Sequence, residues 1–166
     1  MSKQAIKHFK KHDPILHEFA KTYGELENKK NKRGHFEALV EAIVSQQLSV
    51  KASDTIFKRF VALFPGKKFP TPEMILKVSP EKMRTVGISN QKANYILDLS
   101  QKVFAKELKL AGLDKLDNEQ VIEELTKVKG IGRWTAEMFL MFSLLREDVF
   151  STGDLGLKNA IRNLYN

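Results

Sequence analysis

The sequence of 166 residues contains no cysteine. This absence excludes disulfide bonds, zinc sites built from thiolates and iron–sulfur clusters held by cysteine. A chain without thiols also fits a reducing compartment, where disulfide bonds do not persist. No iron–sulfur cluster is therefore expected.

Long apolar runs and alternating strand patterns are also scarce. No segment approaches the roughly 20 apolar residues that a membrane-spanning helix needs. The amino-terminal sequence MSKQAIKHFKKHDPILHEF lacks the continuous apolar core of a signal peptide. Only residues 148–151 are a candidate strand. We therefore expect a cytoplasmic protein, nucleoid-associated if bacterial, with no membrane partner.

What the sequence does have is positive charge and enough apolar residues for a core. The formal net charge is +8, and 42% of the residues are hydrophobic. The length suits one compact domain, or two small lobes that share a cleft. A basic domain suggests a polyanionic partner, but many proteins are basic for solubility alone. Charge by itself leaves the two explanations equally good.

Helical periodicity runs through almost the whole chain. Asp13 and Pro14 form a cap followed by a proline at the first helical position, which predicts a helix to about Gly24. Elsewhere, apolar residues recur at spacings of three and four, which predicts about eight to ten helices with short connections. The predicted class is all-α. Clear apolar stripes are formed by Phe36, Leu39, Val40, Ile43 and Val44, and by Thr135, Met138, Phe139, Phe142 and Leu145.

The sequence KGIG joins two of these predicted helices. Gly130 and Gly132 allow positive φ and a close approach of another backbone. Arg133 follows, so the second helix starts with exposed N–H groups beside a cation, and such a start can hold a phosphate. An ordinary helix-ending turn is the commoner explanation of the spacing alone.

Asp154 follows Gly153 and precedes the last apolar stripe, so it lies at or near a helix amino terminus. That position favours a carboxylate and keeps it ionised. An aspartate in this place is usually only an N-cap. From the residues alone, the cap is the better interpretation. Glu137, Glu147 and Asp148 are interpreted as solvated or salt-bridging residues.

Several blocks together resemble one known family. LTKVKGIGRWTAEMF at residues 125–139 resembles the helix-hairpin-helix of base-excision DNA glycosylases, and VFSTGDLGLKNAI at 149–161 resembles the segment carrying the aspartate of the helix-hairpin-helix Gly/Pro/Asp (HhH-GPD) superfamily. Residues 36–60 and 70–100 look like the DNA-3-methyladenine glycosylase II (AlkA-like) branch. The resemblance is collinear over roughly residues 13–166. It implies a two-lobed, all-α fold with the hairpin at the cleft.

The resemblance implies a single glycosylase domain at residues 1–166. It also implies that the carboxyl-terminal helices, and the amino-terminal sheet domain of some relatives, are lacking. The implied activity is hydrolytic excision of alkylated purines such as 3-methyladenine and 7-methylguanine, with Asp154 as the catalytic carboxylate. Bifunctional relatives carry a lysine two residues after the second hairpin glycine. Trp134 stands there in this chain, which implies a monofunctional enzyme without lyase activity.

Further site residues follow from the same resemblance. Trp134 and Met138 are expected in the base pocket, where an aromatic face would stack on a flipped cationic base. Gln46, Gln47 and Leu48 are expected at the DNA minor groove, with Gln47 favoured as the side chain that fills the gap. The remaining DNA contacts are expected at Gly130, Gly132, Arg133 and Thr135.

The resemblance implies no cofactor for the chemistry. A structural Na⁺ or K⁺ is expected on the main-chain carbonyls of Thr126, Val128 and Ile131, bridging to a DNA phosphate. The expected partner is double-stranded DNA containing damaged bases, bound by a monomer. The basic segment with Lys29, Lys30, Lys32 and Arg33 is interpreted as a solvated loop, with DNA contact as the alternative.

Two alternatives stay open at this stage. One is a glycosylase for deaminated or mismatched bases, which a substrate panel would distinguish. The other is a non-catalytic helix-hairpin-helix module that only binds the DNA backbone, with steep salt dependence and no base release. The pairing of Asp154 with Trp134 argues against the second.

Overall fold

The computed structural model describes residues 3–24, 33–66 and 68–166. These residues form ten α-helices and one short 3-10 helix, and no strand is found among them. The predicted all-α class is confirmed. The prediction of a strand at residues 148–151 is wrong, because that segment is irregular and leads into the last helix. Within the described ranges, no helix is long and apolar enough to cross a membrane.

The helices follow one another closely along the chain. Their bounds are α1 Lys3–His12, α2 Pro14–Tyr23, α3 His35–Ser45, α4 Val50–Val61, α5 Pro72–Leu76, α6 Pro80–Arg84, α7 Asn90–Phe104, η1 Leu113–Lys115, α8 Asn118–Thr126, α9 Arg133–Phe142 and α10 Leu155–Tyr165.

Local sequence explains where many of these helices begin. Asp13 accepts a 2.9 Å hydrogen bond from the backbone N–H of Leu16, and Pro14 opens α2 as predicted. Thr71 and Ser79 cap the short helices α5 and α6 in the same way, each with proline at the first position. Such caps satisfy amide groups that have no partner inside the helix.

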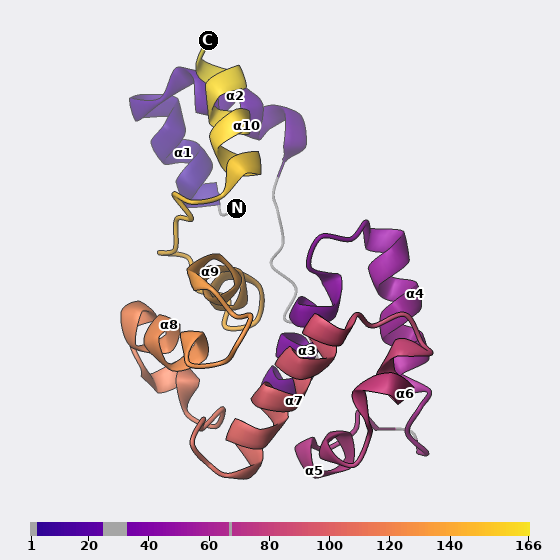
Figure 1. The fold of residues 1–166 in the computed structure, drawn as a ribbon. Coiled ribbons are helices and arrows are strands. Elements are labelled where there is room, and N and C mark those ends of the chain that lie inside the picture. Colours follow the sequence, from indigo (N-terminus) through magenta and orange to yellow (C-terminus); the bar gives the residue numbers. More distant parts are fainter. Residues whose placement is uncertain (1–2, 25–32, 67) are drawn as a thin grey trace.

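Two groups of helices face each other in Figure 1. In one group, α7 packs against α3, α5 and α6, and α3 also packs against α4. The second group contains the α8–α9 pair and, above it, α10 packed against α2, which in turn packs on α1. Contacts between α3 and α9 join the two groups. The first two helices and the last helix, which follows Asp154, therefore lie together.

The hydrophobic core extends through both groups. Leu39, Val40 and Ile43 of α3 are fully buried, as are Ile96 of α7 and Leu140 of α9. Burial of side chains of this size contributes about 1.5–3 kcal/mol each relative to exposure. The α3 stripe predicted from the sequence is thus the face that packs against α4, α7 and α9.

The predicted basic loop is described only in part. Lys29, Lys30 and Lys32 lie outside the described residues. Arg33 is described: it forms ion pairs with Glu37 and Glu41, and its guanidinium lies 5.7 Å from the centroid of the Phe57 ring. This arginine is therefore held against the helices that follow it.

Candidate functional site

Asp154 is the N-cap of α10. Its Oδ1 accepts a 2.7 Å hydrogen bond from the backbone N–H of Leu157. That bond, the indole N–H of Trp134 and the backbone N–H of Gly156 lower the pKa of Asp154 from its ordinary value of 3.8. A carboxylate held in this way is ionised at neutral pH. The cap predicted from the sequence is present.

Trp134 is the second residue of α9, and the residue is 48% exposed. Its Nε1 donates a 2.6 Å hydrogen bond to Oδ2 of Asp154. The structure therefore brings together the two residues on which the sequence analysis placed most weight. The contact fixes the edge of the indole ring and leaves part of the aromatic surface accessible.

Arg133, expected to contact DNA, is engaged within the protein. Its guanidinium forms a two-pronged ion pair with Glu119 of α8, with one contact at 2.9 Å, and its Nε lies 3.1 Å from Oε1 of Glu137. The hydrogen bond from Arg133 lowers the pKa of Glu119. Of the two interpretations of Glu137 from the sequence, solvated or salt-bridging, the second is confirmed, because the residue is paired with Arg133 and only 7% exposed. Its other oxygen accepts a 2.5 Å hydrogen bond from Ser151.

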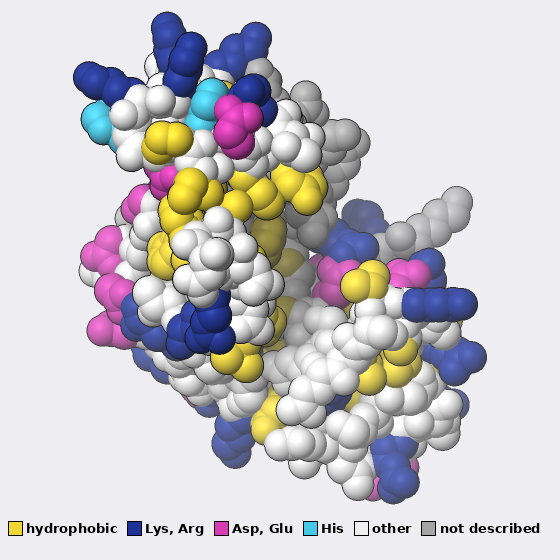
Figure 2. All heavy atoms as spheres, turned by 90° about the horizontal axis from the view of Figure 1, so that it is seen from above, with side chains coloured by type: hydrophobic (Ala, Val, Ile, Leu, Met, Phe, Trp, Pro, Cys, Tyr) yellow, Lys and Arg dark blue, Asp and Glu magenta, His cyan; other side chains and the backbone are white. Residues whose placement is uncertain are grey.

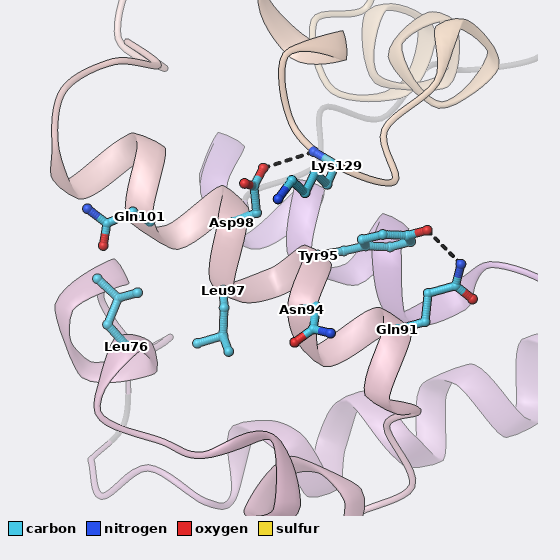
Figure 3. A pocket seen from close by; sticks show the side chains of 8 residues that line it. All are labelled: Leu76, Gln91, Asn94, Tyr95, Leu97, Asp98, Gln101 and Lys129. Carbon is cyan, nitrogen blue, oxygen red and sulfur yellow. Dashed lines mark hydrogen bonds between the residues drawn. The ribbon is translucent and has the colours of Figure 1, made fainter.

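The hairpin turn is held by contacts that require a glycine at one position. Gly130 has a φ of 81°, and a Cβ atom there would lie 2.0 Å from the ring of Tyr95. Gly132 has an extended φ of −92° and open space around it. The backbone N–H of Lys129 donates a 2.9 Å hydrogen bond to Asp98 of α7, shown with Tyr95 in Figure 3. The first glycine is thus needed for packing, and the second is not.

The turn after α3 is tied to this hairpin. The side-chain amide of Gln46 donates a 2.8 Å hydrogen bond to the carbonyl of Gly130. Lys92 of α7 donates to the carbonyls of Val44 and Gln46, at 2.8 and 2.7 Å. Gln47 is exposed and has a positive φ of 56°. Gln46 is therefore a tether, whereas Gln47 projects from a strained turn.

These segments enclose a cavity of about 590 Å³. Its lining includes Gln46, Gln47 and Leu48 of the turn after α3, and Trp134 and Thr135 of α9. Figure 2 shows the hollow between the two groups of helices, with hydrophobic side chains along it. Asp154 is linked to this cavity through its hydrogen bond to Trp134.

Met138 lines a neighbouring cavity of about 220 Å³, together with Phe139 and Phe142. Thr135, which is 7% exposed, lines both cavities. We call the 590 Å³ cavity the Trp134 cavity. Met138 therefore lines the cavity next to it and is not among the residues that line the Trp134 cavity itself.

The model of the HhH-GPD superfamily of base excision DNA repair proteins matches residues 40–166. The chain belongs to this superfamily. The fold and the family resemblance inferred from the sequence are thereby confirmed.

Named relatives of this HhH-GPD chain include two curated DNA-3-methyladenine glycosylases. The first, DNA-3-methyladenine glycosylase 1 of Schizosaccharomyces pombe, is 40% identical over 81% of this chain and 59% of its own length. The second, DNA-3-methyladenine glycosylase 2 of Escherichia coli, is 28% identical over 74% of this chain and 46% of its own length. The chain thus spans about half to three fifths of these relatives.

Solved structures are similar over nearly the whole chain. The S. pombe enzyme in complex with abasic DNA superposes with a TM-score of 0.82 at 36% identity, covering 98% of this chain and 80% of that one. A DNA-3-methyladenine glycosidase from Bacillus halodurans gives a TM-score of 0.84 at 40% identity, covering 99% and 74%.

The three carbonyls expected to hold a monovalent cation belong to the HhH-GPD hairpin. Thr126 ends α8, whose last carbonyls have no partner inside the helix. The carbonyl of Val128 accepts the N–H of Ile131 at 3.1 Å and retains a second lone pair. Carbonyl oxygen is a suitable ligand for a hard cation. Within the part of the chain that is described, no cluster of three or more His, Cys, Asp or Glu residues is arranged to hold a metal.

Sequence reasoning missed several residues that shape the HhH-GPD site. Ser151, Lys92 and Tyr95 carried no local signal, because their partners lie far along the chain. A signal for Glu137 was present in its spacing of four residues from Arg133, which places both on one helix face.

Proposed function

We propose that this chain is a monofunctional DNA glycosylase that hydrolyses the N-glycosidic bond of alkylated purines in double-stranded DNA. The observation that carries the proposal is the hydrogen bond between Asp154 and Trp134, a residue that lines the cavity. It combines an aromatic surface for a flipped base with an ionised carboxylate. The proposal also includes the location: the enzyme would carry out base excision in the cytoplasm, where it meets DNA.

Asp154 supplies the charge that the reaction needs. Loss of a base builds positive charge on the sugar, as in other glycosidic cleavages. A fixed carboxylate stabilises that transition state and can orient or deprotonate the attacking water. The lowered pKa of Asp154 keeps the group anionic at neutral pH. An N-alkylated purine leaves as a neutral base, so a single carboxylate suffices.

Trp134 supports both the substrate class and the absence of lyase chemistry. Its electron-rich face favours a cationic base through cation–π attraction. A tryptophan has no amine, so no Schiff base can form at this position. Gln47 and Leu48, which are both exposed and both line the cavity, would enter the duplex and fill the gap left by the flipped nucleotide.

The hairpin completes the proposed DNA contact. The amide groups at the start of α9, which no side chain caps, suit a phosphate. A Na⁺ or K⁺ on the carbonyls of Thr126, Val128 and Ile131 would add electrostatic attraction to the backbone and take no part in bond cleavage. The protein would act as a monomer on one lesion.

Release of free 3-methyladenine or 7-methylguanine from methylated duplex DNA tests the proposal. Asp154→Asn should reduce release at least about 100-fold, in the range typical of losing one transition-state electrostatic group. Asparagine is as good an N-cap as aspartate, so folding and duplex binding should survive. Asp117→Asn is the matched control, because Asp117 caps α8 in the same manner away from the cavity.

Two outcomes would contradict the proposal. Full activity of Asp154→Asn would remove the carboxylate from the mechanism. Salt-dependent DNA binding by the wild-type protein with no base release from methylated, deaminated or mismatched DNA would favour a binding module. Release from deaminated or mismatched DNA alone would move the substrate class away from alkylated purines.

A further inference from the structure

Glu137 is a buried carboxylate that the proposed mechanism does not use. It lies in the middle of α9, and its side chain is 9% exposed. Burying a charge is costly unless the group is paired and hydrogen-bonded. Both of its oxygens are satisfied: Oε1 by Nε of Arg133 at 3.1 Å, and Oε2 by the hydroxyl of Ser151 at 2.5 Å.

Ser151 connects this carboxylate to the catalytic segment. It is 1% exposed and belongs to the irregular chain between α9 and α10. Its hydroxyl donates to Glu137, while its carbonyl accepts the backbone N–H of Asp154 at 3.1 Å. A single serine therefore links α9 to the residue that carries the proposed chemistry.

The segment is thus fastened to α9 at two points. Trp134 holds the side chain of Asp154, and Glu137, about one turn further along the helix, holds Ser151. Trp134 alone would hold only the side chain of Asp154, and Glu137 alone would hold only the backbone that leads to it. With both in place, the carboxylate of Asp154 has a defined position relative to the Trp134 cavity before substrate binds.

We propose that Glu137 and Ser151 are positioning residues that set Asp154 for base hydrolysis. This inference rests on the proposed function. Electrostatic stabilisation depends on placement, because a misplacement of about 1 Å can reduce a rate roughly 100-fold. Arg133 contributes by neutralising the charge of Glu137. The other nitrogens of the Arg133 guanidinium pair with Glu119 of α8. The guanidinium thereby helps to hold Glu137 in place.

The first test compares two buried serines. Ser151→Ala removes the link to Glu137, whereas Ser100→Ala removes a 2.7 Å hydrogen bond to the carbonyl of Ile96 inside α7. Rates of base release are measured with enzyme in excess over DNA, at a temperature below the unfolding midpoints of both variants. We expect Ser151→Ala to be roughly 10- to 100-fold slower with unchanged affinity for duplex DNA. Ser100→Ala should keep the wild-type rate. Equal losses in both variants would overturn the proposal.

A double-mutant cycle shows whether the effect passes through Asp154. Adding Ser151→Ala to Asp154→Asn should slow the residual reaction no further. An undiminished loss in that background would overturn the proposal. Glu137→Gln retains an acceptor for the serine hydroxyl and should recover much of the rate lost in Glu137→Ala. Equal rates in these two variants would also overturn it.

A fluorescence readout separates this inference from the proposed function. Trp134 is the only tryptophan of the chain, so its emission reports on the Asp154 contact without any substrate. Ser151→Ala and Glu137→Ala should shift the emission and increase acrylamide quenching, while Ser100→Ala should do neither. An unchanged spectrum overturns the positioning role. A changed spectrum in a protein that releases no base supports the positioning and rejects the glycosylase function.

Discussion

The indole N–H of Trp134 and the carboxylate of Asp154 form a 2.6 Å hydrogen bond that joins the start of α9 to the start of α10. Each residue has an individual role at the proposed site, and the contact makes the two roles interdependent. The tryptophan lowers the pKa of the carboxylate. The carboxylate in turn limits the orientation of the indole ring beside the cavity.

Replacing Trp134 with phenylalanine should therefore raise the pKa of Asp154. The largest contribution to the lowered pKa comes from the N–H of Leu157, which the variant retains, so the increase should be partial. Because the folded-state pKa lies below 3.8, Asp154 stabilises the fold above that value, and the contribution is lost as pH falls through the folded pKa. In the Trp134→Phe variant, the stabilisation that Asp154 contributes should be smaller, and it should be lost at a higher pH. A ¹³C NMR titration of the carboxyl group measures the change, and an unaltered pKa would show that the bond is not formed in solution.

The two hairpin glycines should respond differently to alanine. Gly130→Ala places a Cβ against Tyr95 at a residue with positive φ, which should cost about 2–3 kcal/mol of unfolding free energy. Gly132→Ala meets open space at a negative φ and should cost at most about 1 kcal/mol, because Gly132 is the N-cap of α9 and alanine is a poorer N-cap than glycine. Urea denaturation measures both. Similar losses in the two variants would contradict the packing described for the turn.

Gln47 should be dispensable for stability and necessary on duplex DNA. Gln47→Gly removes the side chain at a φ of 56°, where glycine is favoured by about 1 kcal/mol, so thermal stability should be kept or raised. Base release from duplex DNA should fall, because nothing fills the gap beside the flipped nucleotide. Wild-type release by this variant would remove Gln47 from the proposed DNA contact.

Replacing Gln46, unlike replacing Gln47, should lower the stability of the protein. Gln46→Ala loses the hydrogen bond to the carbonyl of Gly130, which is worth about 1 kcal/mol. Unfolding midpoints of Gln46→Ala and Gln47→Ala, measured side by side, test this difference. The assignment of Gln46 as a tether is wrong if both alanine variants are as stable as the wild type.

Lys92 should stabilise the turn that presents Gln47. Lys92→Met keeps the length of the side chain but loses two hydrogen bonds to carbonyls at the end of α3. A loss of about 1–2 kcal/mol is expected. Lys77→Met is the control, because Lys77 is exposed and forms a surface ion pair with Glu73. Chemical denaturation of the two variants distinguishes a specific contact from a general effect of removing positive charge.

Features that depend on nearby residues were predictable from the sequence. The caps at Asp13 and Asp154 connect residues three positions apart, and both are present. The α3 stripe is buried because its spacing follows the helical period. Local pattern could not indicate that Arg133 pairs with Glu119, or that Met138 lies in a separate cavity.

The sequence by itself determined the helical class, the position of the glycine turn and the residue at the start of α10. It also placed a tryptophan, which has no amine, two residues after the second hairpin glycine. The tertiary structure alone decided which side chains meet: Trp134 with Asp154, Glu137 with Ser151, and Gln46 with Gly130. Helix periodicity and capping depend on neighbours along the chain, whereas these contacts depend on how packed helices bring distant segments together. Asp154 is thus a helix cap by its sequence, and its position beside Trp134 comes from the fold.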